Sequence, residues 1–161
     1  MNKQKVNRLL TDMKPLKDLK IALASDHAGY NLKLKVIDFL KSKGAQTTDF
    51  GCYSTESCDY PDFAHPMAAA VEKGEADFGI TICSTGNGIC MTANKHQGIR
   101  AALCWDKRIA ELARQHNNAN VLGLPANFIS EELALEMVEI FFNTDFEGGR
   151  HERRVNKIPV C

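Results

Sequence analysis

The stretch from Gly79 to Lys95, GITICSTGNGICMTANK, decides how the rest of the chain is interpreted. It begins with a β-branched run, Ile80 to Ile82, of the kind that fits a buried strand. A turn of small residues, CSTGNG, follows from Cys83 to Gly88. Apolar residues then return at helical spacing with Ile89 and Ala93. The stretch therefore predicts a strand, a glycine-containing loop and a helix, in that order.

This predicted loop has the character of an anion site. Free backbone N–H groups and the positive end of a helix dipole meet where a helix follows such a loop, so the point can hold a phosphate or an oxyanion formed during a reaction. The loop begins with Cys83, and a thiol at a helix N-terminus can have its pKa lowered below about 8.5. The alternative is a small core cysteine before an ordinary turn. Neither a Walker A motif nor G-x-G-x-x-G is present here, which disfavours nucleotide binding.

Size and charge restrict the classes of function. The 161 residues predict one domain, and 44% hydrophobic with 25% charged residues is ordinary for a globular protein. Twenty basic and twenty acidic side chains give a formal charge of zero, which argues against nucleic-acid and membrane-surface partners. The sequence contains no apolar run of about 18–20 residues and no secretory signal. We expect a cytoplasmic protein that acts on a small molecule.

The six cysteines do not form a recognisable metal or disulfide pattern. They include no C-x-x-C pair, and no histidine spacing completes a zinc motif. In a reducing cytosol we expect free thiols. His65 with Asp59 and Asp62 could suggest a metal, but ligand types gathered at a helix start are more often caps and surface groups.

Strand-like and helix-like segments alternate along the chain. After an N-terminal extension, 1–18, a pattern of strand, turn and helix repeats five times within a single domain, 19–161. This alternation predicts an α/β fold, a Rossmann-like three-layer αβα sandwich with a five-stranded parallel sheet. Further strands are predicted at 19–24, 46–50, 98–105 and 121–124, and further helices at 30–43, 62–74, 106–116 and from 130.

Three groups of polar residues lie at positions where such a fold can place functional side chains. Asp26 and His27 follow the first strand, where residues line the ligand crevice of an open parallel sheet, although an N-cap with a solvated histidine fits equally. His116 ends a predicted helix and can be functional or partly buried. The arginine-rich tail from about 147 follows a Gly-Gly break and suits phosphate, or forms a solvated charged helix.

Taken together, seven short motifs carry a resemblance to a known family. In chain order they are SDHAG (25–29), DYPD (59–62), CSTGNG (83–88), ANK (93–95), GIRA (98–101), RQHN (114–117) and EGGRH (147–151). Each is weak alone, but their order resembles that of the type B ribose-5-phosphate isomerases from Leu19 to about Ile158. The same family contains galactose-6-phosphate isomerase subunits and isomerases of other short sugar phosphates.

The resemblance implies an aldose–ketose isomerase that interconverts ribose 5-phosphate and ribulose 5-phosphate through an enediolate, without a metal or an organic cofactor. Cys83 matches the general base that moves a proton between C2 and C1. Members without this cysteine use a Glu at the position of Ile89, so Cys83 is the one candidate. Thr85 matches a residue that handles a hydroxyl proton, and His116 matches the residue that opens the furanose ring.

The resemblance also implies a binding site and an assembly. His27, Arg150 and Arg154 match phosphate-binding positions. Family members are homodimers, often paired into homotetramers, whose active sites are shared between two chains. The remaining matched residues orient or line the sugar (Asp26, Tyr60 and Asn117) or hold the enediolate oxygen through the loop backbone (Ser84, Gly86, Asn87 and Gly88).

Two positions depart from the family pattern. Ser84 replaces a more common glycine, and Asn127 stands where many members have a phosphate-binding arginine. An isomerase of another sugar phosphate (erythrulose 4-phosphate, allose 6-phosphate or galactose 6-phosphate) is therefore the first alternative. A non-catalytic sugar-phosphate sensor is the second, and the presence of Cys83, Thr85 and His116 together argues against it.

Overall fold

The computed structural model describes residues 13–160 and contains the predicted five-stranded parallel sheet. All neighbouring strands run parallel, in the order β2-β1-β3-β5-β4. The Rossmann-like α/β prediction is confirmed. The strands are β1 (Lys20–Ser25), β2 (Gln46–Asp49), β3 (Phe78–Cys83), β4 (Ala101–Leu103) and β5 (Val121–Pro125).

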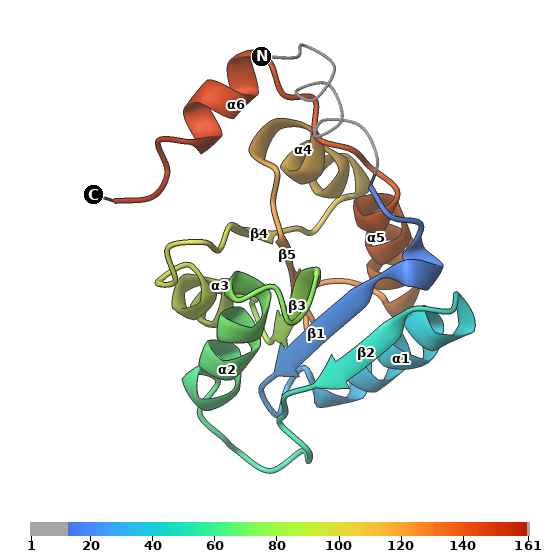
Figure 1. Cartoon of the computed structure of the whole chain (residues 1–161). Coiled ribbons are helices and arrows are strands. Elements are labelled where there is room, and N and C mark those ends of the chain that lie inside the picture. The colour runs from blue at the N-terminus through green and yellow to red at the C-terminus, as the bar shows by residue number, and fades with distance from the viewer. Residues whose placement is uncertain (1–12, 161) are drawn as a thin grey trace.

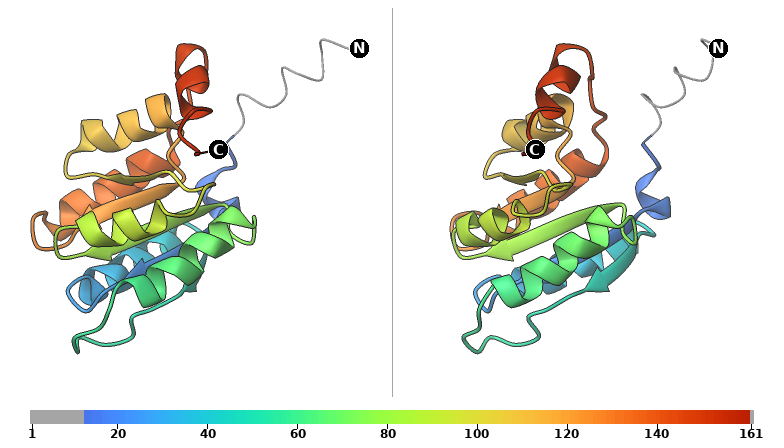
Figure 2. Two further views of the ribbon diagram at one scale, coloured as in Figure 1. Left: turned by 90° about the vertical axis from the view of Figure 1, so that its left-hand side faces the viewer. Right: turned by 60° about the vertical axis from the view of Figure 1, so that its left-hand side comes forward.

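Helices cover both faces of this sheet, which makes three layers (Figures 1 and 2). One face carries α1, α4 and α5, whose buried residues join those of the strands in the larger hydrophobic cluster. The other face carries α2 and α3 over a smaller cluster. The helices are α1 (Tyr30–Ser42), α2 (Pro61–Glu72), α3 (Asn87–Ala93), α4 (Lys107–Asn117), α5 (Glu131–Phe142) and α6 (Arg150–Val155), with a 3₁₀ turn, η1 (Leu16–Asp18).

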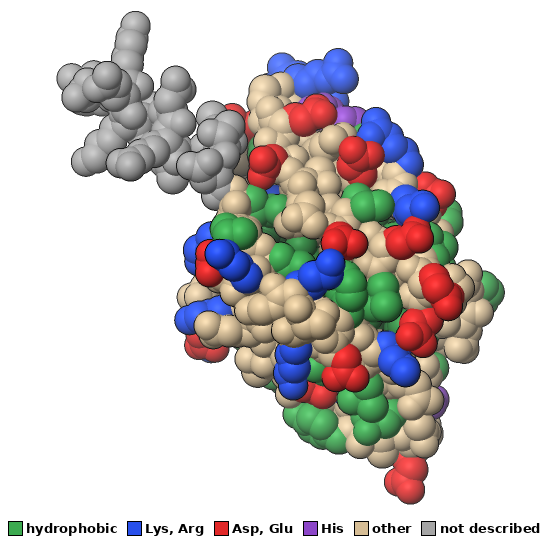
Figure 3. Space-filling view, turned by 90° about the vertical axis from the view of Figure 1, so that its right-hand side faces the viewer, with side chains coloured by type: hydrophobic (Ala, Val, Ile, Leu, Met, Phe, Trp, Pro, Cys, Tyr) green, Lys and Arg blue, Asp and Glu red, His purple; other side chains and the backbone are tan. Residues whose placement is uncertain are grey.

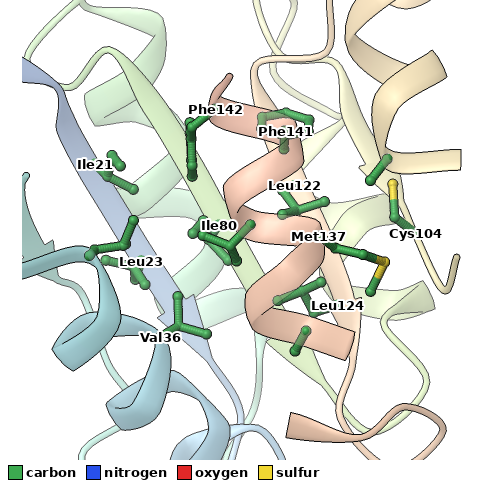
Figure 4. Packing of buried hydrophobic residues seen from close by; sticks show 14 of the residues in the cluster. Ile21, Leu23, Val36, Ile80, Cys104, Leu122, Leu124, Met137, Phe141 and Phe142 are labelled. Atoms are coloured by element: carbon green, nitrogen blue, oxygen red, sulfur yellow. The ribbon is translucent and has the colours of Figure 1, made fainter. Parts of the chain in front are cut away.

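The larger cluster fixes the sheet against α1 and α5. Ile80 and Leu122 point from the two central strands toward Met137 and Phe141 of α5 (Figure 4), and all four side chains are completely buried. Burying one such side chain contributes about 1.5–3 kcal/mol, so this face anchors the central strands that carry the loops.

The central strands also create the place where a ligand crevice is expected. β1 and β3 are neighbours, with Ser25 opposite Ile82. The helix after β1 covers one face and the helix after β3 covers the other. The carboxyl ends of these two strands therefore form the topological switch point, where ligands of open α/β sheets bind. This pairing brings the residues after Ser25 next to Cys83.

Some local predictions are corrected by tertiary packing. The strand predicted over 98–105 is only Ala101–Leu103, because Asn120 holds the chain just before it at Arg100 N–H and the Gly98 carbonyl. The helix predicted over 62–74 is α2, Pro61–Glu72, and it contains Pro66 in its interior. The predicted tail forms α6, which packs on α4 with His151 and Val155 buried.

The last residues of the predicted N-terminal extension lie against the folded domain. Residues 1–12 lie outside the described range, whereas Leu16 is buried against the core and Lys14 pairs with Asp77. Within residues 13–160, no helix is long and apolar enough to cross a membrane. Basic and acidic side chains are mixed on the face in Figure 3, as the balanced composition predicts.

Candidate active site

Cys83 ends β3 in a position fixed by the start of α1. Its side chain is 5% exposed. Asp26 N–H donates to the Ile82 carbonyl at 3.2 Å, and the Asp26 carboxylate accepts from Gly29 N–H at 2.9 Å. Gly29 itself has no room for a side chain, because a Cβ would overlap the Ile82 carbonyl oxygen. The small residue thus lets α1 approach β3 and brings the buried Asp26 beside Cys83.

The pKa of Cys83 is raised in this structure, and the expectation of a lowered pKa is wrong. Burial of the thiol is the largest cause, and the negative charge of Asp26 adds to it. The backbone N–H groups of Ile89, Gly86 and Thr85 act in the opposite direction and lower the pKa, as expected for a helix N-terminus. Burial outweighs them, because charging a desolvated thiol is costly.

The loop after Cys83 has the predicted compact form. Gly86 has φ of +76°, and a Cβ there would overlap the Leu103 side chain. Asn87 N–H donates to Thr85 Oγ1 at 3.2 Å, and both residues are exposed. A Cβ on Gly88 would lie 2.6 Å from the Tyr60 ring, so Tyr60 packs directly on the loop. The loop therefore presents Thr85 beside a partly exposed aromatic ring.

His27 is held in one tautomer by a neighbouring loop. Cys58 N–H donates to His27 Nδ1 at 3.3 Å, so a neutral His27 carries its proton on Nε2 and can donate it to an anion. Lys33 steadies the same loop: its completely buried ammonium donates to Asp49 Oδ1 at 2.6 Å and to the Cys52 carbonyl at 2.5 Å. His27 is half-buried next to Asp26.

The two departures from the family pattern touch each other. Asn127 Nδ2 donates to Ser84 Oγ at 2.7 Å, and Asn127 N–H donates to the Ser84 carbonyl at 3.1 Å. The amide of Asn127 thus satisfies the hydroxyl of Ser84, the residue that follows Cys83. The family pattern singles out both positions but gives no sign that they form a pair.

A second group of candidate residues lies at the end of α4 and on α6. Asn117 ends α4, and His116 lies beside it with 37% of its side chain exposed. Arg150 and Arg154 are exposed on α6. His116, Asn117 and Arg154 line a surface hollow of about 370 Å³ together with His151. This group contains the predicted ring-opening, hydroxyl-binding and phosphate-binding residues.

One chain does not bring the two groups together. Cys83 pairs with Pro125 at the carboxyl end of β5, whereas Val121 at its amino end pairs with Gly79. Four residues of strand separate these levels, or about 13 Å. His116 precedes Val121 at the amino end, because α4 runs back along the sheet. In Figure 1 the arrowheads of β1 and β2 point away from α6.

The structure adds two residues that the sequence reasoning did not single out. His151 stacks on His116 with ring centroids 4.1 Å apart and an interplanar angle of 10°. Glu147 Oε2 lies 3.8 Å from His116 Nε2 and 3.7 Å from His151 Nε2. Both residues belong to the EGGRH motif, which was interpreted through its arginine alone. By contrast, His65 contacts His96 on the surface at 2.9 Å and joins neither group.

The comparisons with known proteins agree on one family. The profile of the ribose/galactose isomerases matches residues 21–158. Ribose-5-phosphate isomerase B of Escherichia coli is 44% identical over 141 residues, which cover 88% of this chain and 95% of the relative. The solved ribose 5-phosphate isomerase of Thermotoga maritima is 52% identical with a TM-score of 0.86, covering 88% of this chain and 97% of that one.

A further solved relative contains a sugar phosphate. The structure of ribose-5-phosphate isomerase B from Mycoplasma genitalium, with bound ribulose-5-phosphate, is 45% identical with a TM-score of 0.84. The alignment covers 86% of this chain and 93% of that one. This chain belongs to the ribose/galactose isomerase family.

Proposed function

We propose that the protein interconverts ribose 5-phosphate and ribulose 5-phosphate as an aldose–ketose isomerase. The support is family membership over residues 21–158, together with relatives at 44–46% identity that are named ribose-5-phosphate isomerase B. The relative with bound ribulose-5-phosphate supports a phosphorylated sugar as the ligand. We further propose a cytoplasmic enzyme, in keeping with the free thiols of all five described cysteines.

Cys83 is the proposed general base. Its thiolate takes the proton from C2 of the open-chain aldose, and the C–H electrons form the C1–C2 double bond of an enediolate. The thiol then returns the proton to C1, which yields the ketose. Thr85 transfers the hydroxyl proton between O1 and O2. Such positioned proton transfer contributes typically 10²–10⁴-fold to a rate, so about that much depends on this sulfur.

The loop backbone supplies the electrostatic part of the proposal. The N–H groups of Thr85, Gly86 and Ile89 already face the Cys83 sulfur, where they stabilise negative charge. As the proton moves from carbon to sulfur, the charge moves from the thiolate to the enediolate oxygen. Donors fixed at this point need no rearrangement, which is the basis of oxyanion stabilisation. Asp26 and Tyr60 are placed to orient the sugar beside them.

Two copies of the chain complete the proposed site. The observation that carries this is the separation of about 13 Å along the sheet between the level of Cys83 and the level where α4 ends. A five-carbon sugar phosphate cannot reach both groups within one chain. In a two-fold dimer, the carboxyl edge of one sheet can face α4 and α6 of a second copy, and the same contact then occurs twice.

In that arrangement the phosphate lies between the chains. His27 of one copy donates its Nε2 proton, and Arg150 and Arg154 of the second copy supply guanidinium groups that suit phosphate oxygens. His116 and Asn117 of the second copy reach the sugar ring and a hydroxyl. His116 gives a proton to the ring oxygen, the bond between C1 and that oxygen breaks, and the C1 hydroxyl proton passes to water, which leaves the open-chain aldehyde.

A different sugar phosphate remains the competing substrate, and the Ser84–Asn127 hydrogen bond is the observation that favours testing it. This pair at 2.7 Å places two uncharged side chains beside the loop, where an arginine would add a cation. The purified protein is offered aldose phosphates of four, five and six carbons, and ketose formation is followed. Highest kcat/KM with ribose 5-phosphate supports the proposal, and preference for a six-carbon sugar overturns the substrate. Binding of all sugars without turnover would indicate a sensor.

A further inference from the structure

The stack of His151 on His116 is a feature that the proposed chemistry does not use. The rings are 4.1 Å apart and inclined by only 10°. His116 is on α4 and partly exposed, whereas His151 is on α6 and 7% exposed. The contact therefore joins a side chain that is open to solvent to one that is almost buried.

Four further contacts fix this stack. Glu147 N–H donates to the Gln115 carbonyl at 3.0 Å, which ties the segment before α6 to the last turn of α4. His151 N–H donates to the Gly148 carbonyl at 3.0 Å and starts α6. The Glu147 carboxylate then lies 3.8 and 3.7 Å from the Nε2 atoms of His116 and His151. The two rings consequently share one counter-charge.

The same three side chains also satisfy a distance test for a metal ion, since their ligand atoms lie within 4.8 Å of one another. Their orientation argues against that use. An ion bound to an imidazole nitrogen lies in the plane of the ring, and two stacked rings inclined by 10° cannot both point at one ion between them. Arg150 and Arg154 of the same helix add positive charge near the site. The arrangement suits one proton better than a dication.

We propose that His151 is a positioning residue that, together with Glu147, holds the His116 imidazole in one orientation. This inference rests on the proposed isomerase function. Stacking removes the freedom of a half-exposed ring, and catalytic geometry depends on such restriction. Two adjacent imidazolium ions beside one carboxylate are unfavourable.

The surroundings of His151 favour its neutral form. Burial lowers the pKa of His151, and the neighbouring charges of His116, Arg150 and Arg154 lower it further, whereas Glu147 opposes them. His151 therefore stays neutral at pH values where a free imidazole begins to charge. The more exposed His116 is the member of the pair that is open to a ligand.

Two substitutions separate stacking from titration. His151→Phe keeps a flat ring and removes the titratable nitrogens, whereas His151→Ala removes the ring. We expect kcat for ribose 5-phosphate to fall about tenfold or more in His151→Ala and to stay within about threefold in His151→Phe. KM should change little in both, since the arginines remain. Erythrose 4-phosphate cannot close a furanose ring. If the unmodified protein converts this sugar, neither His151 substitution should change the kcat for it.

NMR gives a test that does not depend on activity. It applies if the variants are inactive or if the protein does not convert erythrose 4-phosphate. In proton NMR of the free protein, the His116 imidazole signals should be shifted upfield by the neighbouring ring in the unmodified protein and in His151→Phe, but not in His151→Ala. In His116→Asn the pKa of His151 should rise, because a like charge is removed.

The inference is overturned if His151→Ala retains full kcat on ribose 5-phosphate, if Ala and Phe lose kcat equally, or if the His116 signals do not respond to His151→Ala. Absence of isomerase activity in the unmodified protein would instead contradict the proposed function. The NMR result would then still decide whether the stack exists.

Discussion

The two groups of candidate residues use different parts of the chain, mainly backbone in one and side chains in the other. Around Cys83 the site is mainly backbone: a glycine at φ +76°, N–H groups aimed at sulfur, and glycines that admit Asp26 and Tyr60 closely. At the end of α4 it is made of side chains on a six-residue helix, α6, with Arg150 and Arg154 exposed. The first group can stabilise a negative charge that is located on one atom. The second suits a phosphate, which long flexible arginines can follow.

Their positions differ as much as their construction. One group lies at the carboxyl edge of the sheet, and the other lies at the amino edge, about 13 Å away along the strands. The proposed proton transfer at carbon and the proposed arginine contacts with phosphate are thus assigned to opposite edges of the same chain. The comparison teaches that neither edge is a complete site, and the predictions below separate the contribution of each.

The largest effect is expected at the backbone-built edge. Cys83→Ala should lower kcat by about 10²–10⁴-fold with substrate binding within a few-fold, because the sulfur acts on a C–H bond. Steady-state kinetics and calorimetry with ribose 5-phosphate measure the two quantities. Cys104→Ala is the matched control, since this buried thiol lies after β4 in the core. Activity of Cys83→Ala within tenfold of the unmodified protein would remove Cys83 from its role.

The next largest effect is expected at the side-chain-built edge. A charge-assisted contact with phosphate is worth about 1.5–3 kcal/mol, so Arg150→Ala or Arg154→Ala should raise KM by roughly 10- to 150-fold. The effect should vanish for binding of an analogue without phosphate. Arg153→Ala, an exposed neighbour on the same helix, is the control. Equal losses in Arg153→Ala would mean that α6 acts only through its net charge.

The smallest effect concerns the pKa of Cys83. Burial raises this pKa and the Asp26 carboxylate raises it further. Thiolate formation, and with it the rate of alkylation by iodoacetamide, should therefore increase with pH up to values above the usual range for cysteine. Asp26→Asn keeps an oxygen for Gly29 N–H but removes the charge, so the curve should move to lower pH. Asp38→Asn, exposed on α1, should leave it in place. A shift to higher pH in Asp26→Asn would contradict the assigned cause.

The sequence predicted what depends on local pattern. The strand, glycine loop and helix around Cys83 follow from β-branched residues, small residues and helical spacing within seventeen positions, and the structure contains all three. The position of Asp26 and His27 followed from the rule that ligands bind beyond the carboxyl ends of parallel strands. These features need no knowledge of distant contacts.

The remaining features depend on packing between distant segments. The pKa direction of Cys83 was wrong because burial and the closeness of Asp26 arise only when α1 packs on β3. The stack of His151 on His116 joins residues 35 positions apart and requires α6 to dock on α4. The Ser84–Asn127 pair likewise joins two loops. A single sequence contains no local pattern for such contacts.

Subunit exchange tests the central claim most directly. Cys83→Ala is mixed with the double variant Arg150→Ala/Arg154→Ala, and activity is measured with ribose 5-phosphate far below KM. If the two edges meet between chains, each mixed dimer has one site with both lesions and one intact site, and random exchange should restore about a quarter of the unmodified activity. No recovery, with mixed dimers demonstrated by native mass spectrometry, would place Cys83 and the arginines in the same chain's site and contradict the account.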